Sequence, residues 1–516
     1  MTSNLTRRGF GASLAASGAN SGAASPSKPP NLVFVFSDQQ SYDMLGSSGN
    51  RQIQTPALDA FAKDSVRFRH CVANSPLCTP YRGILLSGQH SLRNGAIEND
   101  IRMLPGGGNY FGEVLRQAGY QTGYIGKWHL YGGNRVRPIP AGEYRYGFDG
   151  TFLSNNCTTV FDENRAYYWD QQGERRRYGD WEPYAQTRQA EDFLDRQGAD
   201  PFALFLSWHP PHNWTPVNPP PKGPEDQYGA PEDMLRLYDP DAIRVRGNCE
   251  NTDSHRRVYR GHMAMCTSLD RAFGQLMKKL ADKGLADNTI VVYTSDHGDT
   301  LLSHGFRFNK MRPEAESIRV PFLLRYPGVL RPRNSDLLLG TLDLMPTLLG
   351  LMGLRVPDTC QGVNLADPIR RANDNAVDSV PLFLLNLDWR GVYTRRHTYA
   401  FDTSRPGGDA LYRQSYFRVP ENIRWNCLYD RTRDPWELRN LFGDPQTSKL
   451  QKRLHELSLD WMKRLGDPGV SYDEVLRAAM SPEDLALRAA GKFFAQRNGV
   501  LRGQPAALLG SPKSTP

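Results

Sequence analysis

"NLVFVFSDQQ", residues 31–40, contains a run of large apolar side chains that ends at Asp38. A strand that is apolar on both faces is typical of the centre of a parallel sheet covered by helices on either side. Three other apolar runs also end in polar side chains: Ile290–Thr294 before Asp296 and His297, a shorter run before Lys127, Trp128 and His129, and Phe202–Ser207 before His209 and His212.

Helical segments alternate with these strands. Thr55 and Pro56 begin one predicted helix, residues 110–118 form a second that stops at Gly119, and residues 262–283 form a third that ends at Gly284. This alternation predicts the α/β class: a large domain whose central, mostly parallel sheet lies between helices. A smaller C-terminal α+β subdomain with a short antiparallel sheet is expected to follow it.

The expected domain limits are 31–370 for the large domain, 371–470 for the subdomain and 471–516 for a C-terminal extension. The subdomain contains the strand-like "HTYAFDTS" and "NCLYDRT" and the helical "LQKRLHELSLDWMKRL", and the tail from Gly510 is expected to be disordered. Residues 1–30, with Arg7-Arg8, Phe10 and then small side chains, resemble a twin-arginine export signal. Export to the periplasm or medium is therefore expected; a disordered tail on a cytoplasmic protein is the alternative.

Composition limits the classes of function. The 516 residues are 23% charged and 39% apolar, which is typical of a soluble globular protein, and no apolar run approaches the roughly 20 residues that span a bilayer. The net charge of +8 is modest, and Arg175–Arg177, preceded by Glu174, is too short for a nucleic-acid-binding arm. The positive excess instead favours an anionic substrate. None of the seven cysteines forms a CxxC pair, which argues against a zinc knuckle.

Ligands of such folds collect beyond the carboxyl ends of the strands, where this chain places acidic and basic groups. Carboxylates such as Asp38 and Asp296 favour Ca²⁺, Mg²⁺ or Mn²⁺, the imidazole of His297 shifts the preference toward Mn²⁺ or Zn²⁺, and Gln39 adds an amide oxygen. A second set of side chains carries positive charge or protons and suits a tetrahedral oxyanion. Its members are Arg82, Lys127, His129, His212 and Lys310.

A cysteine lies at the start of a predicted helix in "SPLCTPYRGILLSG", residues 75–88. Pro80 suits the first turn, so Cys78 lies where free N–H groups and the helix dipole lower the pKa of a thiol. Cysteine-dependent phosphatases place their Cys and Arg six apart, whereas Cys78 and Arg82 are four apart and Pro80 removes one N–H donor. That spacing argues against such a phosphatase, and a buried structural thiol is the other alternative.

Cys78-Thr79-Pro80-Tyr81-Arg82 matches the C-x-P-x-R motif of the formylglycine-dependent sulfatases of the alkaline phosphatase superfamily, which the chain resembles. "GILLSGQHSLRNG", "GYQTGYIGKWHL", "SDHGD", "HGFRFNK" and "SIRVPFLLRYPG" match further blocks in the family's order, and "LYDRTRDPWELRNLFGDP" resembles its closing segment. The resemblance covers roughly residues 31–445.

The resemblance implies a large sulfatase domain and a sulfuric ester hydrolase acting on a sulfated small molecule or glycan. A formylglycine-generating enzyme would oxidise Cys78 to formylglycine, whose hydrate attacks the sulfur beside a divalent metal. Aligned with the family, Asp38, Asp296, His297 and the modified Cys78 bind the metal, and Arg82 stabilises the hydrate. Lys127 and Lys310 then bind sulfate and His129 is the base. His212 binds sulfate or assists the leaving group, with His209 as the second choice.

Two departures from the family pattern keep alternatives open. Gln39 stands where many members carry a second Asp, and His297 stands where many carry Asn. This combination resembles the phosphonate monoester hydrolase branch, so hydrolysis of a phosphonate or phosphodiester is the first alternative. Ca²⁺ is the expected metal, with Mn²⁺ or Mg²⁺ as alternatives. If Cys78 is not oxidised, a non-catalytic anion- or glycan-binding protein is the outcome from another class.

The expected substrate is a sulfated carbohydrate, because the family commonly uses one. Five aromatic side chains could form a wall on which a sugar stacks, or could instead pack loops: Tyr167, Tyr168, Trp169, Trp208 and Trp214. The proline-rich residues 214–234 and residues 150–198 are expected to border the entrance.

Overall fold

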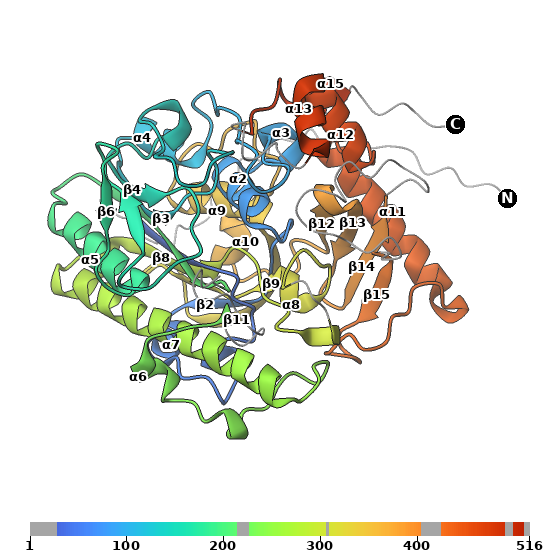
Figure 1. The fold of residues 1–516 in the computed structure, drawn as a ribbon, viewed down its shortest axis with the longest axis horizontal. Coiled ribbons are helices and arrows are strands. Elements are labelled where there is room, and N and C mark those ends of the chain that lie inside the picture. The colour runs from blue at the N-terminus through green and yellow to red at the C-terminus, as the bar shows by residue number, and fades with distance from the viewer. Residues whose placement is uncertain (1–27, 214–226, 306–308, 404–424, 491–498, 510–516) are drawn as a thin grey trace, which may run out of the picture.

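The centre of the fold is β1 (Asn31–Asp38), which is buried along its whole length. A computed structural model describes residues 28–213, 227–305, 309–403, 425–490 and 499–509 (Figure 1). In it β1 lies between two parallel neighbours, and five strands run parallel in the order β8-β1-β7-β3-β4. The other four are β3 (Gln121–Lys127), β4 (Thr151–Asn155), β7 (Phe202–Pro211) and β8 (Thr289–Ser295). The predicted parallel centre is confirmed.

The edges of this 11-stranded sheet are mixed. Beyond β8, β10 pairs antiparallel with β8 and with β2, and β11 runs parallel to β2. Beyond β4, β5 and β6 form an antiparallel hairpin. The edge strands are β2 (Val66–Val72), β5 (Tyr167–Trp169), β6 (Arg175–Arg177), β9 (Arg319–Val320), β10 (Phe322–Arg325) and β11 (Arg333–Gly340).

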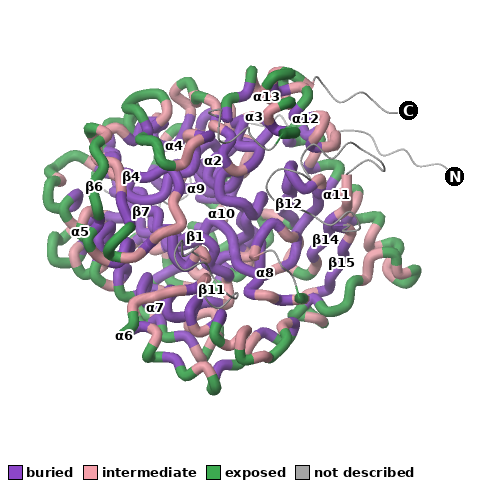
Figure 2. The backbone as a smooth tube through the Cα atoms, in the orientation of Figure 1, coloured by how far each residue is buried: buried purple, intermediate pink, exposed green. Residues whose placement is uncertain are grey.

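Helices cover both faces of the sheet. Alternate side chains of β1 point to opposite faces and therefore enter two separate cores. Val33 and Val35 pack with helices on one side, and Phe34 and Phe36 pack with helices on the other. The first side has α1 (Pro56–Lys63), α5 (Glu182–Asp195) and α7 (Asp253–Asp282). The second has α2 (Cys78–Ser87), α4 (Phe111–Gln117) and α9 (Thr341–Leu351). The central strands β1, β7 and β8 and helix α2 form the buried interior, whereas the edge strand β6 is exposed (Figure 2).

A second sheet of four antiparallel strands follows, as predicted. Its strands are β12 (Val380–Leu384), β13 (Trp389–Tyr393), β14 (His397–Asp402) and β15 (Cys427–Asp430). Phe383 and Val392 of this sheet pack against Leu454 and Trp461 of α11 (Ser448–Leu465). Beyond it lie α12 (Tyr472–Ala479), α13 (Pro482–Ala489) and α15 (Pro505–Leu509).

Short helices complete the described part: α3 (Ser91–Asn94), α6 (Glu232–Leu235), α8 (Ala315–Ile318) and α10 (Ala366–Arg370). None of the helices in this part has the length and apolarity that crossing a bilayer requires. The predicted export signal, Trp214 and the tail from Gly510 lie outside the described residues. The predicted domain limits stay predictions.

Candidate active site

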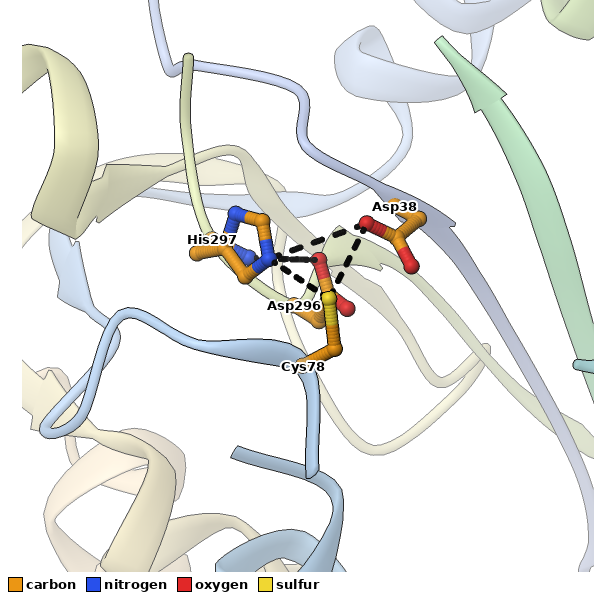
Figure 3. A group of neighbouring side chains, drawn as sticks. All are labelled: Asp38, Cys78, Asp296 and His297. Carbon is orange, nitrogen blue, oxygen red and sulfur yellow. Dashed lines mark hydrogen bonds and ion pairs between the residues drawn. The ribbon is translucent and has the colours of Figure 1, made fainter. Parts of the chain in front are cut away.

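Three chain segments bring four polar residues together at the carboxyl edge of the parallel strands. Asp38 is the last residue of β1, Asp296 and His297 follow β8, and Cys78 is the first residue of α2. Their ligand atoms all lie within 4.8 Å of one another, and all four residues are buried. Figure 3 shows these side chains pointing toward one another. The expected cluster of Asp38, Cys78, Asp296 and His297 is therefore assembled by the fold.

The two carboxylates divide their oxygens between two sets of partners. Arg82 Nη2 donates to Oδ2 of Asp38 and to Oδ2 of Asp296, at 3.1 Å each, and Lys127 Nζ also donates to Oδ2 of Asp38. The Oδ1 atoms face the other way, 3.6 Å and 3.5 Å from His297 Nε2. Two carboxylate oxygens and an imidazole nitrogen that converge beside a thiol fit a divalent cation.

Gln39, the fifth predicted ligand, lies beside this cluster. Its backbone N–H donates to Asp296 Oδ1 at 3.0 Å, with the left-handed φ of 72°. Its side-chain Nε2 donates to Asp299 Oδ2 at 2.7 Å and to Asn213 Oδ1 at 3.1 Å. The amide oxygen Oε1 is buried and has no hydrogen-bond partner among the described residues, so it remains an available acceptor.

Cys78 lies at the buried start of α2, where the sequence predicted it. Burial alone would raise the pKa of its thiol, but Lys127, Lys310 and His297 hold that pKa well below its usual range. Its Sγ lies 3.3 Å from His297 Nε2 and 3.2 Å from Lys310 Nζ. The side chain of residue 78 thus lies between the cation cluster and a lysine.

Arg82, one turn into α2, is fixed on the protein side of the cluster. Besides the two carboxylates, its Nη1 donates to the Lys127 carbonyl at 2.8 Å and to Ser207 Oγ at 2.7 Å. Its side chain is 1% exposed. Because one guanidinium contacts residues of β1, β3 and β7 and the residue after β8, Arg82 holds the strand ends in register.

Lys310 and His212 lie together, and Lys310 contacts Cys78. Lys310 Nζ is 2.8 Å from His212 Nε2, and His212 Nδ1 lies 2.6 Å from the Asn213 carbonyl. That carbonyl requires the proton on Nδ1, so Nε2 is the acceptor. Burial and Lys310 lower the pKa of His212. With no carboxylate between them, Lys310 and His212 form an anion-accepting pair.

His129 is held by an acidic residue that the sequence did not reveal. Its Nε2 lies 3.1 Å from Asp100 Oδ1, and Asp100 also accepts from Arg135 at 2.8 Å and 2.6 Å. Burial would lower the pKa of His129, but Cys157 and Asp100 outweigh it and raise that pKa to about 10. Asp100 lies in an irregular segment, so no strand pattern marked it.

Replacing Asp100 with Asn should lower the pKa of His129 by about 1 to 3 units, because a charge that favours imidazolium is lost. Stabilisation by His129 is complete below about pH 6.5 and is lost as the pH rises toward about 10, the pKa in the folded state. Urea unfolding of protein with an unmodified Cys78 across this range, with NMR titration of the His129 imidazole, measures both effects. An unchanged imidazole titration in D100N would contradict the assignment.

His209 faces a different partner from His212. Its Nδ1 lies 2.6 Å from Glu182 Oε1, both side chains are 1% exposed, and Phe161 stacks on the ring. His209 also interacts with the thiol of Cys157, whose pKa His129 and Lys127 lower against the effect of burial. Glu182 and Cys157 were not recognised in the sequence, because neither follows a strand of the predicted pattern.

Of the two interpretations left open for the aromatic residues, a sugar-stacking wall is excluded for Trp208, which is fully buried in the core with Val33 and Val35. Trp208 lies inside β7, and its side chain packs on the face of the sheet that α1, α5 and α7 cover. Tyr167 is 7% exposed with Arg175 over its ring at 3.8 Å, and Tyr168 and Trp169 are half-buried on the same hairpin.

Comparison with known proteins gives a consistent answer. The family model "Sulfatase" matches residues 30–354, and the model "N-sulphoglucosamine sulphohydrolase, C-terminal" matches residues 303–463. The chain is 32% identical to an ulvan-active sulfatase of Formosa agariphila, covering 88% of this chain and 84% of that one. It is 29% identical to an endo-4-O-sulfatase of Bacteroides thetaiotaomicron, covering 86% and 94%.

Solved structures agree. One, described under the metabolism of multiple glycosaminoglycans by Bacteroides thetaiotaomicron, has a TM-score of 0.73 at 28% identity and covers 87% of this chain and 98% of that chain. A phosphonate monoester hydrolase of Agrobacterium radiobacter has a TM-score of 0.64 at 16% identity, covers 84% of this chain and 96% of that chain, and shows the shared fold alone. Since the sulfatase model spans more than half of the chain and the curated relatives align over most of it, the chain belongs to the sulfatase family and is a sulfuric ester hydrolase.

Proposed function

We propose that this enzyme removes a sulfate ester from a sulfated carbohydrate, using formylglycine made from Cys78 and a divalent cation. The observation that carries the proposal is the position of the Cys78 side chain. It lies between the cluster of Asp38, Asp296 and His297 and the amine of Lys310, 3.2 Å from its sulfur. A group on this carbon can contact a metal and an anionic substrate at once.

Asp38, Asp296 and His297 would hold the cation, with residue 78 as a further ligand and the free Oε1 of Gln39 within the same buried region. When bound, the cation would supply positive charge that activates the attacking oxygen and neutralises the sulfate oxygens. Ca²⁺ is our first choice because two ligands are carboxylates; the imidazole keeps Mn²⁺ or Mg²⁺ as alternatives.

The chain's own cations would orient the sulfate group. Lys310 has no carboxylate within salt-bridge distance among the described residues, so its ammonium is available for a sulfate oxygen. Lys127 is paired with Oδ2 of Asp38 and would bind a second sulfate oxygen. Fixed charges in a buried site stabilise developing negative charge without reorganisation.

Two histidines would move protons. His212 is paired with Lys310 through Nε2, so a proton held between them can pass to the leaving alcohol oxygen. His129 is oriented by Asp100 through Nε2, and its Nδ1 is buried with no partner among the described residues. Nδ1 is the atom that would exchange a proton with the hydroxyl on residue 78, and with a pKa of about 10 it accepts that proton only in the neutral form of the imidazole.

Relatives support a carbohydrate as the alcohol component. The names of curated relatives specify ulvan activity, endo-4-O-sulfatase activity and N-acetylglucosamine-6-O-sulfatase activity. Hydrolysis of a phosphonate monoester or a phosphodiester remains the second candidate function, because Gln39 and His297 replace the Asp and Asn of many sulfatases.

Paired aryl sulfate and aryl phosphonate substrates test the choice. We expect a higher kcat/KM for the sulfate after chelation and readdition of Ca²⁺, because the curated relatives that align over most of the chain are named as sulfatases. Readdition of Mn²⁺ in parallel determines the metal. A large preference for the phosphonate under both metals would overturn the proposal.

Maturation and location are proposed with it. A formylglycine-generating enzyme would act on Cys78, and Arg7-Arg8 would direct export. Mass spectrometry of the peptide that contains Cys78, with and without that enzyme coexpressed, detects the aldehyde. Cell fractionation of the chain and of a variant with both arginines replaced by lysine tests export. An unmodified thiol in fully active protein, or unchanged export of the variant, would overturn these two points respectively.

A further inference from the structure

The C-terminal extension, which follows α11, contacts residues 93–102. This segment contains Asp100, the partner of His129. Both family models end by residue 463, so α12, α13 and α15 lie beyond them. In Figure 1 these helices lie beside α3, and α15 packs against it. Gln504 Nε2 donates to the Arg93 carbonyl at 2.8 Å. The extension is therefore docked on the large domain near the chain that follows α3.

Buried side chains anchor this contact. Arg488 Nη1 of α13 forms an ion pair with Glu98 Oε1, with the two side chains 0% and 4% exposed. Leu501 is 5% exposed and belongs to the same apolar cluster as Ile97 and Ile101. A buried ion pair and an apolar contact, both on residues 97–101, restrict that segment on each side of Asp100.

Backbone atoms complete the contact at Gly499. Its carbonyl accepts from the Arg102 N–H at 2.6 Å. A Cβ at residue 499 would lie 2.0 Å from the Asp100 carbonyl oxygen and 3.1 Å from Gly133 N, and the φ of 62° is left-handed. The Asp100 carbonyl in turn accepts from Gly133 N at 2.8 Å. Only glycine permits this approach, so the Asp100 backbone is fixed from the extension.

Asp100 then orients His129, with 3.1 Å between carboxylate oxygen and Nε2. We infer that the extension after α11 is a positioning element of the active site: Gly499 and Arg488 fix residues 98–102, and Asp100 thereby fixes the imidazole of His129. This inference rests on the proposed role of His129 as the base. Gly499 and Arg488 are positioning residues, because neither contacts the cluster around Cys78.

Gly499→Ala is the decisive variant. We expect kcat on an aryl sulfate to fall between about 10- and 100-fold with KM little changed, because a displacement near 1 Å misplaces the base. Gly466→Ala is the matched control: Gly466 has a φ of 69°, and a Cβ there would meet nothing within 4 Å. It reproduces the backbone strain without the clash and should leave kcat unchanged.

A double-mutant cycle separates positioning from general destabilisation. If Gly499 acts through Asp100, G499A should lower kcat in the otherwise native chain and add little in an Asp100→Asn background. Equal losses in both backgrounds, or a native kcat for G499A, would overturn the inference. If G499A does not fold, Leu501→Val is measured in the same cycle with the same expectation.

A His129→Ala arm distinguishes failure of the inference from failure of the proposed function. Native activity in H129A would remove His129 as the base, whatever G499A does. Loss of activity in H129A with native kcat in G499A would leave the proposed function intact and reject only the role of the extension.

Discussion

Cys78→Ala should lower turnover of an aryl sulfate by at least about 10³-fold, because it removes the group from which the proposed nucleophile would be made. The side chain is 1% exposed and contacts His297 and Lys310. The variant should remain folded, since only one sulfur atom is deleted from a polar cluster. Initial rates with saturating metal, together with thermal unfolding, measure the two effects.

Cys427→Ala is the matched control for this loss. Cys427 is also a buried thiol, but it lies in β15 of the second sheet among apolar side chains. Its truncation should cost stability and leave the turnover of folded enzyme unchanged. Substantial activity in the Cys78 variant would show that residue 78 supplies no nucleophile, in which case the anion-binding alternative would regain weight.

Arg82→Met should lower the free energy of unfolding by about 3–5 kcal/mol, because it leaves two buried carboxylates without their shared cation. The guanidinium is 3.1 Å from both Asp38 and Asp296, and burial makes that pairing important. Activity should fall as well, because the strand ends lose their common contact. Urea unfolding in the presence of a chelator measures the loss without interference from bound metal.

Added divalent metal should recover part of the stability of R82M, since it neutralises the same two carboxylates. The free energy of unfolding of Arg82→Lys should lie between those of the native protein and R82M, because lysine keeps the positive charge but lacks the planar set of donors of the guanidinium. Arg177→Met, on the exposed strand β6, is the control and should be nearly neutral. A native unfolding curve for R82M in chelator would contradict the role assigned to Arg82.

The sequence predicted the centre of the fold because its signal is local. An apolar run such as Leu32–Phe36 that ends in Asp38 specifies both a buried strand and the edge at which its polar residue appears. Because parallel strands bring their carboxyl ends to one edge of the sheet, the sequence alone predicted that Asp38, Asp296 and Lys127 belong to one site. The antiparallel β10 and the β5–β6 hairpin were missed, because strands of three or four residues carry too little pattern to fix direction.

The supporting residues of the site were not predictable for a related reason. Asp100, Cys157 and Glu182 lie in irregular segments or at a helix start, and their importance depends on which histidine the fold places opposite them. Gly499 is more remote still, because its contact with Asp100 joins residues about 400 positions apart and no local pattern encodes such a pair.

The burial of α2 would determine when Cys78 can be modified during biosynthesis. All ten residues of this helix are buried, Pro80 and Arg82 included. A modifying enzyme therefore could not bind the motif once the helix has packed. Reaching it later would require the centre of the large domain to open, which is the most costly kind of local unfolding. The proposed oxidation of Cys78 would therefore compete with folding in time, and the yield of active enzyme should depend on which process reaches the nascent chain first.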